Sequence, residues 1–268
     1  MILIAILMGT LVAGIGSVWL AAVLSFGVLA RYTQHMLSLA AGALLATAFI
    51  HLLPEAFESQ VRAQDLFATL LGGLVFFFLL DKAELWHHGH EHHDIGDRGH
   101  AHAHAHAHAH DDHSHHVKSG GWAVLAGDSV HAFGDGILIA SAFMADTRLG
   151  LVASLAVLVH EVPHHMGDLV VLRQSSNNNR RAALIKVTLA GAVTALGGVI
   201  GYALVDQLYG YLPFFLIIAS SSFIYVALAD LIPQLQKRVS AKETAAQIAW
   251  LLIGIGLVTL ISGIARSH

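Results

Sequence analysis

Long apolar stretches follow one another along almost the whole chain, and they limit what it can fold into. A helix of about 20 apolar residues spans the hydrocarbon core of a bilayer. Charged residues make up only 12% of the chain, about half of what a soluble domain carries. We therefore predict an all-α integral membrane protein whose transmembrane helices form one domain over residues 1–268. Eight stretches fit the description of a membrane span: 2–30, 35–57, 65–85, 119–145, 149–172, 182–205, 211–234 and 245–265.

The first apolar stretch, residues 2–30, contains no charged residue. A secretory signal peptide begins with a basic region and continues with an apolar region of about 7–15 residues. Because this stretch lacks the basic region and is too long for the apolar one, we expect a transmembrane helix that the protein keeps.

The lysines and arginines between the stretches predict how the chain is oriented, because positive residues concentrate in the cytoplasmic loops of membrane proteins. If the N-terminus lies outside, only Arg62, Arg148 and Arg266 fall on the outer side, and the other eleven of the 14 fall on the inner side. We therefore predict a multi-pass protein of the cell or inner membrane with both termini extracytoplasmic. The one long connection, residues 86–118, is then cytoplasmic.

A short internal repeat relates the second and seventh stretches. Ala48–Ala56 reads AFIHLLPEA and Val226–Gln234 reads VALADLIPQ, so each has an apolar run, a polar residue, two apolar residues and a proline. Under the predicted topology the two stretches run in opposite directions. Inverted repeats with proline-broken helices are typical of secondary transporters, although a match this short also arises by chance. We predict an inverted-repeat arrangement of the helices.

Ionisable residues in the middle of the fourth stretch carry a strong functional signal. Asp128, His131 and Asp135 are spaced i, i+3, i+7, which places them on one face of a helix. An ionised side chain at bilayer depth is unfavourable by several kcal/mol unless it faces a partner, a cavity or an ion. These residues should therefore face the interior of the helix bundle.

The fifth stretch supplies a matching set. His160 and His164 form an i, i+4 pair on one face, Asp168 lies one turn further along, and Glu161 lies beside that face. A single histidine here would be explained equally well as a hydrogen-bonding group between helices. Histidines and carboxylates grouped on two neighbouring helices instead favour a metal site, and we predict that both sets contribute ligands to it.

The composition narrows the metal and the partners. The chain has no cysteine, so disulfides and thiolate ligands are excluded, and any metal is held by nitrogen and oxygen. Histidines with carboxylates suit Zn²⁺, Fe²⁺ or Mn²⁺. No basic stripe for nucleic acid is present. We expect the lipid bilayer and divalent metal ions as partners, with Zn²⁺, Fe²⁺ or Mn²⁺ as the bound ion, and no catalytic cofactor.

Two other functions fit some of these residues. The segment His160–His164, HEVPH, satisfies the H-E-x-x-H template of zinc metalloproteases, in which the glutamate is the general base. An intramembrane zinc metalloprotease is therefore the enzyme alternative. However, Pro163 lacks an N–H and should bend the helix, which would misplace the two histidines for proteolysis. A metal-efflux exchanger is the third candidate, because it would use the same ligand types.

The two motifs resemble those of a known family. HAFGDG, residues 131–136, and HEVPHHMGD, residues 160–168, are similar to the ZIP (zinc- and iron-regulated-transporter-like) family, in particular to its subgroup with HNFxDG in the fourth span and HExPHExGD in the fifth. Eight spans, extracytoplasmic termini and a His-rich loop between the third and fourth spans fit the same family. The resemblance implies a homodimeric secondary transporter that imports zinc into the cytoplasm by alternating access, without ATP hydrolysis.

The resemblance also implies which residues bind the metal. His131, Asp135, His160 and His164 would form the main site, and Glu161 and His164 would reach a second one.

Three positions depart from the family pattern. Ala132 stands where the family usually has asparagine, and Thr194 falls where some members have a ligating glutamate. His165 replaces the usual glutamate of the subgroup. The first two departures remove ligands of the second site, so we expect one strong site and at most a weak companion.

Three further polar residues lie near the ends of the second and seventh stretches. His51, Glu55 and Asp230 are candidates for places where the ion enters or leaves the path. Their other interpretation is as ordinary polar residues at the membrane surface. The resemblance favours the functional interpretation slightly, because the family has polar residues at matching places.

The long connection, 86–118, is rich in histidine. Between His87 and His116 lie 14 of the 21 histidines. Such a tract cannot form a core, so we expect it to be disordered without metal. We favour a labile zinc reservoir or sensor over a passive linker, and we expect its metal binding to weaken below about pH 6.5, where imidazole becomes protonated.

Overall fold

The computed structural model describes residues 1–25, 33–89, 120–175, 179–235 and 240–266. Within these ranges the chain is almost entirely helical and has no strand, which confirms the predicted all-α class. Most of the His-rich connection lies outside the described residues. Its first residues, Trp86 to Gly89, continue the helix that precedes them.

The helices form a bundle of long rods, several of them divided by a π-helical turn. In chain order they are α1 (Ile2–Leu11), η1 (Val12–Gly16), α2 (Ser17–Ser25), α3 (Thr33–Ala46), η3 (Thr47–Leu52), α4 (Leu53–Phe57), α5 (Ala63–Gly89), α6 (Gly120–Ala145), α7 (Thr147–Ser175), α8 (Arg180–Gln207), η4 (Tyr209–Tyr211), α9 (Leu212–Tyr225), η5 (Val226–Leu231), α10 (Ile232–Leu235) and α11 (Ala241–Arg266).

Seven helical segments of the described residues are long and apolar enough to cross a membrane. The segment α6 is not among them. Its 26 residues give it a length of about 39 Å, but Asp128, His131 and Asp135 lower its hydropathy. The protein is therefore a multi-pass membrane protein, and the full number of eight spans stays a prediction.

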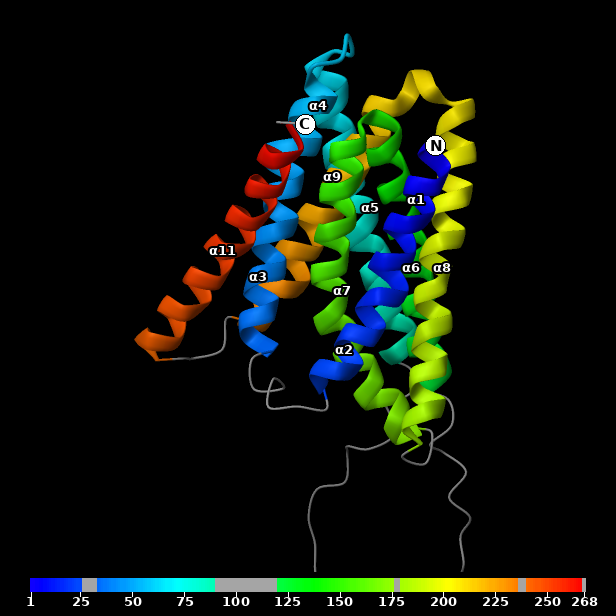
Figure 1. The fold of residues 1–268 in the computed structure, drawn as a ribbon, viewed down its shortest axis with the longest axis vertical. Helices are drawn as coiled ribbons and strands as arrows, with labels where there is room; N and C mark the ends of the chain where they lie inside the picture. Colours follow the sequence, from blue (N-terminus) through cyan, green and yellow to red (C-terminus); the bar gives the residue numbers. More distant parts are fainter. Residues whose placement is uncertain (26–32, 90–119, 176–178, 236–239, 267–268) are drawn as a thin grey trace, which may run out of the picture.

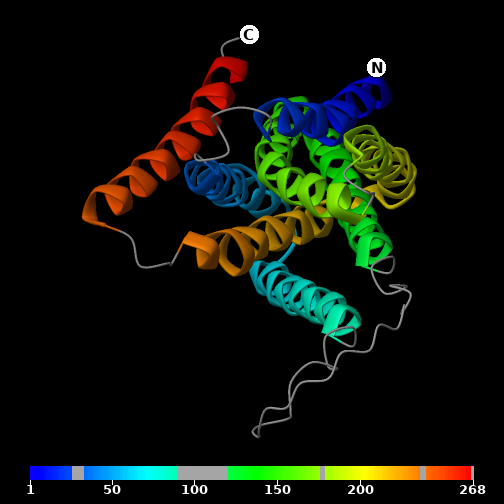
Figure 2. The ribbon, with the colours of Figure 1, turned by 90° about the horizontal axis from the view of Figure 1, so that it is seen from below.

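The rods are arranged with α7 inside the bundle and α5 and α11 at its edges (Figures 1 and 2). The helix α7 contacts α1, η1, α2, α3, α6, α8 and α11. By contrast, α5 and α11 expose large apolar side chains, such as Phe76 and Leu79 on α5 and Leu252 and Leu260 on α11. In a bilayer these side chains face lipid, whereas Asp128 and Asp135 of α6 and His160 and Glu161 of α7 are buried by the surrounding helices.

Glycines bring α6 and α8 into direct backbone contact. A Cβ atom at Gly136 would collide with the carbonyl oxygen of Thr194, and one at Gly197 would collide with the carbonyl oxygen of Phe133. Small residues are enriched at close crossings of membrane helices, and at these two positions there is no room even for the Cβ of alanine. Because Gly136 follows Asp135 directly, this contact fixes α6 next to α8 at the level of the polar cluster.

The short sequence repeat has a counterpart in local structure. The π-helical turn η3 ends two residues before Pro54, and η5 ends two residues before Pro233. Proline lacks the N–H of a regular helical hydrogen bond, and π-helical turns accommodate such irregularities. The rods that contain α3 and α9 run in opposite directions (Figure 1). Both observations agree with the predicted inverted repeat.

Candidate metal centre

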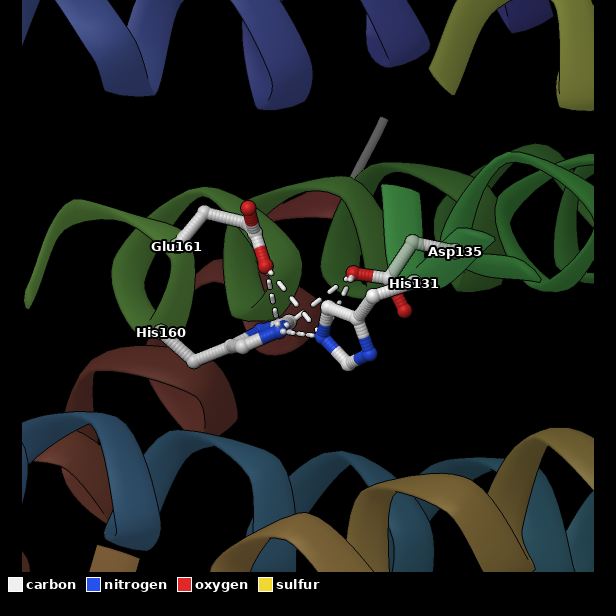
Figure 3. Close-up of side chains that lie close together, drawn as sticks. All are labelled: His131, Asp135, His160 and Glu161. Atoms are coloured by element: carbon white, nitrogen blue, oxygen red, sulfur yellow. Dashed lines mark hydrogen bonds and ion pairs between the residues drawn. The ribbon is translucent and has the colours of Figure 1, made fainter. Parts of the chain in front are cut away.

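The polar faces of α6 and α7 meet inside the bundle. The α-helix α7 continues through Pro163, so His160, Glu161, His164 and His165 keep helical spacing around its axis. Asp135, His160 and Glu161 are at most 3% exposed. Figure 3 shows side chains from the two helices pointing toward one another.

One group of four side chains converges on a single point. His160 Nε2 lies 3.0 Å from Glu161 Oε1, 3.3 Å from Asp135 Oδ2 and 3.4 Å from His131 Nε2. His131 Nε2 lies 3.4 Å from Glu161 Oε1 and 3.9 Å from Asp135 Oδ2. All four ligand atoms lie within 4.8 Å of one another.

These separations match the edges of a metal coordination polyhedron. Zinc binds histidine nitrogen and carboxylate oxygen at about 2.0–2.1 Å in tetrahedral sites, which sets neighbouring ligand atoms about 3.3–3.4 Å apart. The five distances given above, 3.0–3.9 Å, are centred on that value. Two nitrogens and two oxygens around one point are therefore spaced for an ion with only small side-chain movement.

A backbone contact orients one of the histidines. His160 Nδ1 lies 3.2 Å from the carbonyl oxygen of Ala156, one turn earlier in α7. When Nδ1 carries the proton and donates it to this carbonyl, Nε2 presents its lone pair to the cluster. Metal-ligating histidines commonly use their second nitrogen in this way.

One oxygen of each carboxylate in this group lacks a hydrogen-bond partner among the described residues. Asp135 Oδ2 and Glu161 Oε1 are buried and make no hydrogen bond of good geometry with any described residue. Buried polar atoms are almost always hydrogen-bonded, because an unsatisfied one is unfavourable by about 1–3 kcal/mol and a charged one by more. A cation between the four ligand atoms would satisfy both oxygens.

Two further groups continue the cluster along α7. In one, His164 Nε2 lies 3.4 Å from Asp128 Oδ1 and 3.6 Å from Asp168 Oδ2. In the other, Asp128 and Glu161 lie around His165. Glu161 thus belongs to the first group and to the His165 group, and Asp128 belongs to both of the further groups.

The expected ligands are grouped differently in the structure than in the two sites that the family resemblance implies. Glu161, expected at a second site, joins His131, Asp135 and His160, whereas His164 lies with Asp128 and Asp168. The rings of His131 and His164 are still near each other, with centroids 5.6 Å apart.

Two positions of the expected second site lie inside the bundle but do not carry a carboxylate, histidine or asparagine side chain that could bind the metal. Ala132 and Thr194 are both buried. Thr194 Oγ1 lies against Gly14 of η1, so its side chain is occupied in helix packing.

One residue of the cluster was not predicted as a ligand. Sequence reasoning noted His165 only as a departure from the family pattern, yet it is fully buried among carboxylates. The available signal was its i, i+4 spacing from Glu161, which places the two side chains on one face.

Two of the three residues expected near the ends of the path, His51 and Glu55, lie outside these groups. His51 is buried in η3, with Nδ1 3.4 Å from Ser262 Oγ of α11. Glu55 is exposed in α4, and Asp230 lies in η5.

Comparisons with known proteins agree with the motifs. Zinc transporter ZIP13 of Pongo abelii is 26% identical over 286 residues, which cover 96% of this chain and 77% of the relative. Zinc transporter zipt-7.2 of Caenorhabditis elegans is 37% identical over 153 residues, covering 54% of this chain and 32% of the relative. Human zinc transporter ZIP4 is 34% identical over 137 residues, covering 51% of this chain and 20% of the relative. The chain thus matches a third or less of the length of the last two.

A family profile covers far more of the chain than either of those partial matches. The profile described as ZIP Zinc transporter matches residues 1–262, which include every residue of the metal-ligand groups. This protein therefore belongs to the ZIP family of zinc transporters.

Proposed function

We propose that this protein imports Zn²⁺ into the cytoplasm and binds it between α6 and α7 through His131, Asp135, His160 and Glu161. The observation that carries the proposal is the spacing of these four ligand atoms, which fits a tetrahedral zinc ion. Members of the family are zinc transporters and not enzymes, so we do not retain the intramembrane protease.

The charge of the group supports a divalent ion as cargo. Asp135 and Glu161 carry two negative charges when ionised, and neutral imidazoles add none. A divalent cation makes the group neutral, which removes much of the penalty of placing two carboxylates at membrane depth. Fe²⁺ and Mn²⁺ accept the same ligands and are the alternative cargoes.

The three metal-ligand groups form a row along α7, which suggests the path that the ion follows. From His131 and His160 they continue along α7 toward the end of the bundle at which α5 ends and α6 begins (Figure 1). The distribution of lysine and arginine predicts that this end is cytoplasmic and that both termini are extracytoplasmic. The side chain of His164, in the group nearest that end, is 41% exposed, as suits a place of release.

The proposal also covers how the central group becomes accessible, how the protein assembles, and what the polar residues outside the group do. We propose alternating access, in which the central group is open to each side in turn, and a homodimer as the assembled form. His51, Glu55 and Asp230 would contact the ion on its way in or out. The histidines between His87 and His116 would hold zinc loosely on the cytoplasmic side.

The direction of transport separates import from an efflux exchanger. Cells that express this protein should accumulate cytoplasmic zinc faster than control cells when zinc is added outside, as measured with a fluorescent zinc indicator. Cells that express equal surface amounts of the His160→Ala variant provide the matched control. A fall of cytoplasmic zinc that depends on His160 would show an exporter and refute the proposed direction.

A further inference from the structure

A cavity of about 460 Å³ lies between α2, α3, α7 and α11. Leucine, methionine and valine side chains form most of its wall, and the rings of His35 and Trp250 complete it. Its volume is within the range of about 300–1,000 Å³ that is usual for pockets that bind small molecules. Water gains few hydrogen bonds in a space with such walls, and apolar cavities take up apolar molecules instead. The cavity is therefore suited to an apolar ligand.

The cavity reaches from the lipid-facing surface to the interior of the bundle. Its walls on α2 and α11 include Leu20 and Trp250, which are both exposed. The same two helices carry further exposed apolar side chains, such as Val23 and Ile248. The wall on α7 includes Val162, which is only 2% exposed. The cavity is thus continuous with the surface that the bilayer covers, and the molecules that can enter it from there are lipids.

Polar groups lie at the end of the cavity nearest the end of the bundle that is predicted to be cytoplasmic, where α2 ends and α3 begins (Figure 1). His35 is in the first turn of α3, and its ring centroid is 6.0 Å from that of Trp250. One residue before His35, Gln34 Oε1 accepts a hydrogen bond of 3.3 Å from Gln247 Nε2 of α11. Tryptophan rings are enriched at the level of lipid headgroups. A polar end and an apolar depth together match the two parts of a phospholipid.

We propose that this cavity binds one acyl chain of a phospholipid from the leaflet at this end of the bundle. The chain would lie against the apolar walls, and the glycerol and headgroup would face the polar end. The inference goes beyond the proposed function, because none of the described residues that line the cavity belongs to a metal-ligand group. The bound chain would stabilise the folded protein, since it binds only where α2 and α7 are packed beside α3 and α11.

Photochemical labelling of the full-length protein tests this inference. The protein is reconstituted into phosphatidylcholine vesicles in which a small fraction of the lipid carries a diazirine group in one acyl chain. Light then attaches that chain to the residues that it contacts. Mass spectrometry should find label on Phe76 and Leu79 of α5, which face lipid, and also on Val162, which surrounding lipid does not reach unless a chain enters the cavity.

Variants that narrow the cavity provide the comparison. With Leu20→Trp and Met36→Trp, singly or combined, a larger ring occupies part of the space. Label on Val162, relative to label on the α5 residues, should fall at least about fivefold in the combined variant, because a chain would have to displace the new rings from a filled space. The matched control is Leu11→Trp on α1, where the side chain is 39% exposed against 43% for Leu20. This control should keep the ratio of the parent.

The outcomes are distinct from those for zinc transport. Label on the α5 residues with none on Val162 in the parent would overturn the inference, as would happen if another part of this chain or a second copy filled the cavity. Label on Val162 that stays at the parent's ratio in both folded single variants and in the combined one would overturn it as well. A parent protein that is labelled on Val162 but does not import zinc would refute the proposed function and support the lipid site.

Discussion

Zinc uptake by the His160→Ala variant is expected to fall at least about 100-fold, because a direct metal ligand contributes more than the surrounding residues that orient it. His160 Nε2 is within 3.4 Å of the other three ligand atoms of the central group. Its removal leaves one imidazole and two carboxylates, and it frees the Ala156 carbonyl from its side-chain contact. Uptake of radioactive ⁶⁵Zn²⁺ into proteoliposomes measures the effect.

The control for this variant is another histidine of the bundle. His35 lies in α3, where its ring is 6.0 Å from that of Trp250, and it belongs to none of the metal-ligand groups. The His35→Ala variant should transport zinc at a rate within about threefold of the parent, since surface or peripheral substitutions rarely perturb a distant site strongly. Uptake by a folded, membrane-inserted His160→Ala variant within that same range would refute the assignment of His160.

Replacement of Asp135 by asparagine should have opposite effects on zinc binding and on stability. The isosteric amide keeps the shape of the side chain but removes a buried negative charge whose Oδ2 atom has no hydrogen-bond partner among the described residues. We expect the zinc-free variant to be more stable by about 1–3 kcal/mol. We expect its uptake to fall at least about 100-fold, because the charge that balances the ion is halved.

Thermal unfolding with and without zinc measures both effects. Zinc at about 100 times its dissociation constant should stabilise the parent by about 2.7 kcal/mol, because it binds only the folded state. The Asp135→Asn variant should unfold at a higher temperature without zinc and show little further rise when zinc is added. A variant that is stabilised by zinc as strongly as the parent would show that Asp135 is not a ligand.

Hydropathy along the sequence predicts most of the membrane-spanning helices, and α6 is the exception. Most spans are continuous apolar runs that admit no other structure in a bilayer. The segment α6 is less apolar because Asp128, His131 and Asp135 occupy its middle. The residues that make it functional are therefore the ones that weaken its membrane signal.

The sequence also predicts which helices form the site but not how its ligands are grouped. Helical spacing places His160 and His164 on one face, and Glu161 about 100° away around the axis. Whether Glu161 or His164 joins His131 and Asp135 depends on how α7 is rotated against α6, and on the reach of each side chain. Packing of the surrounding helices sets that rotation, for example where Gly136 and Gly197 bring α6 and α8 together.

His165 illustrates the same limit. Adjacent residues of a helix point in directions about 100° apart, so the side chains of His164 and His165 lie on different faces of α7. Each histidine has an i, i+4 partner, His160 for His164 and Glu161 for His165, so the spacing alone does not tell which of the two is buried. In the structure the side chain of His165 is 0% exposed and that of His164 is 41% exposed.

The central claim is that zinc binds between α6 and α7, and anomalous X-ray scattering at the zinc edge tests it most directly. Crystals of the protein grown with Zn²⁺ should show an anomalous peak about 2.0–2.1 Å from His131 Nε2, His160 Nε2, Asp135 Oδ2 and Glu161 Oε1. Anomalous peaks elsewhere in the protein, with no zinc within bonding distance of His160 or Asp135, would contradict the claim.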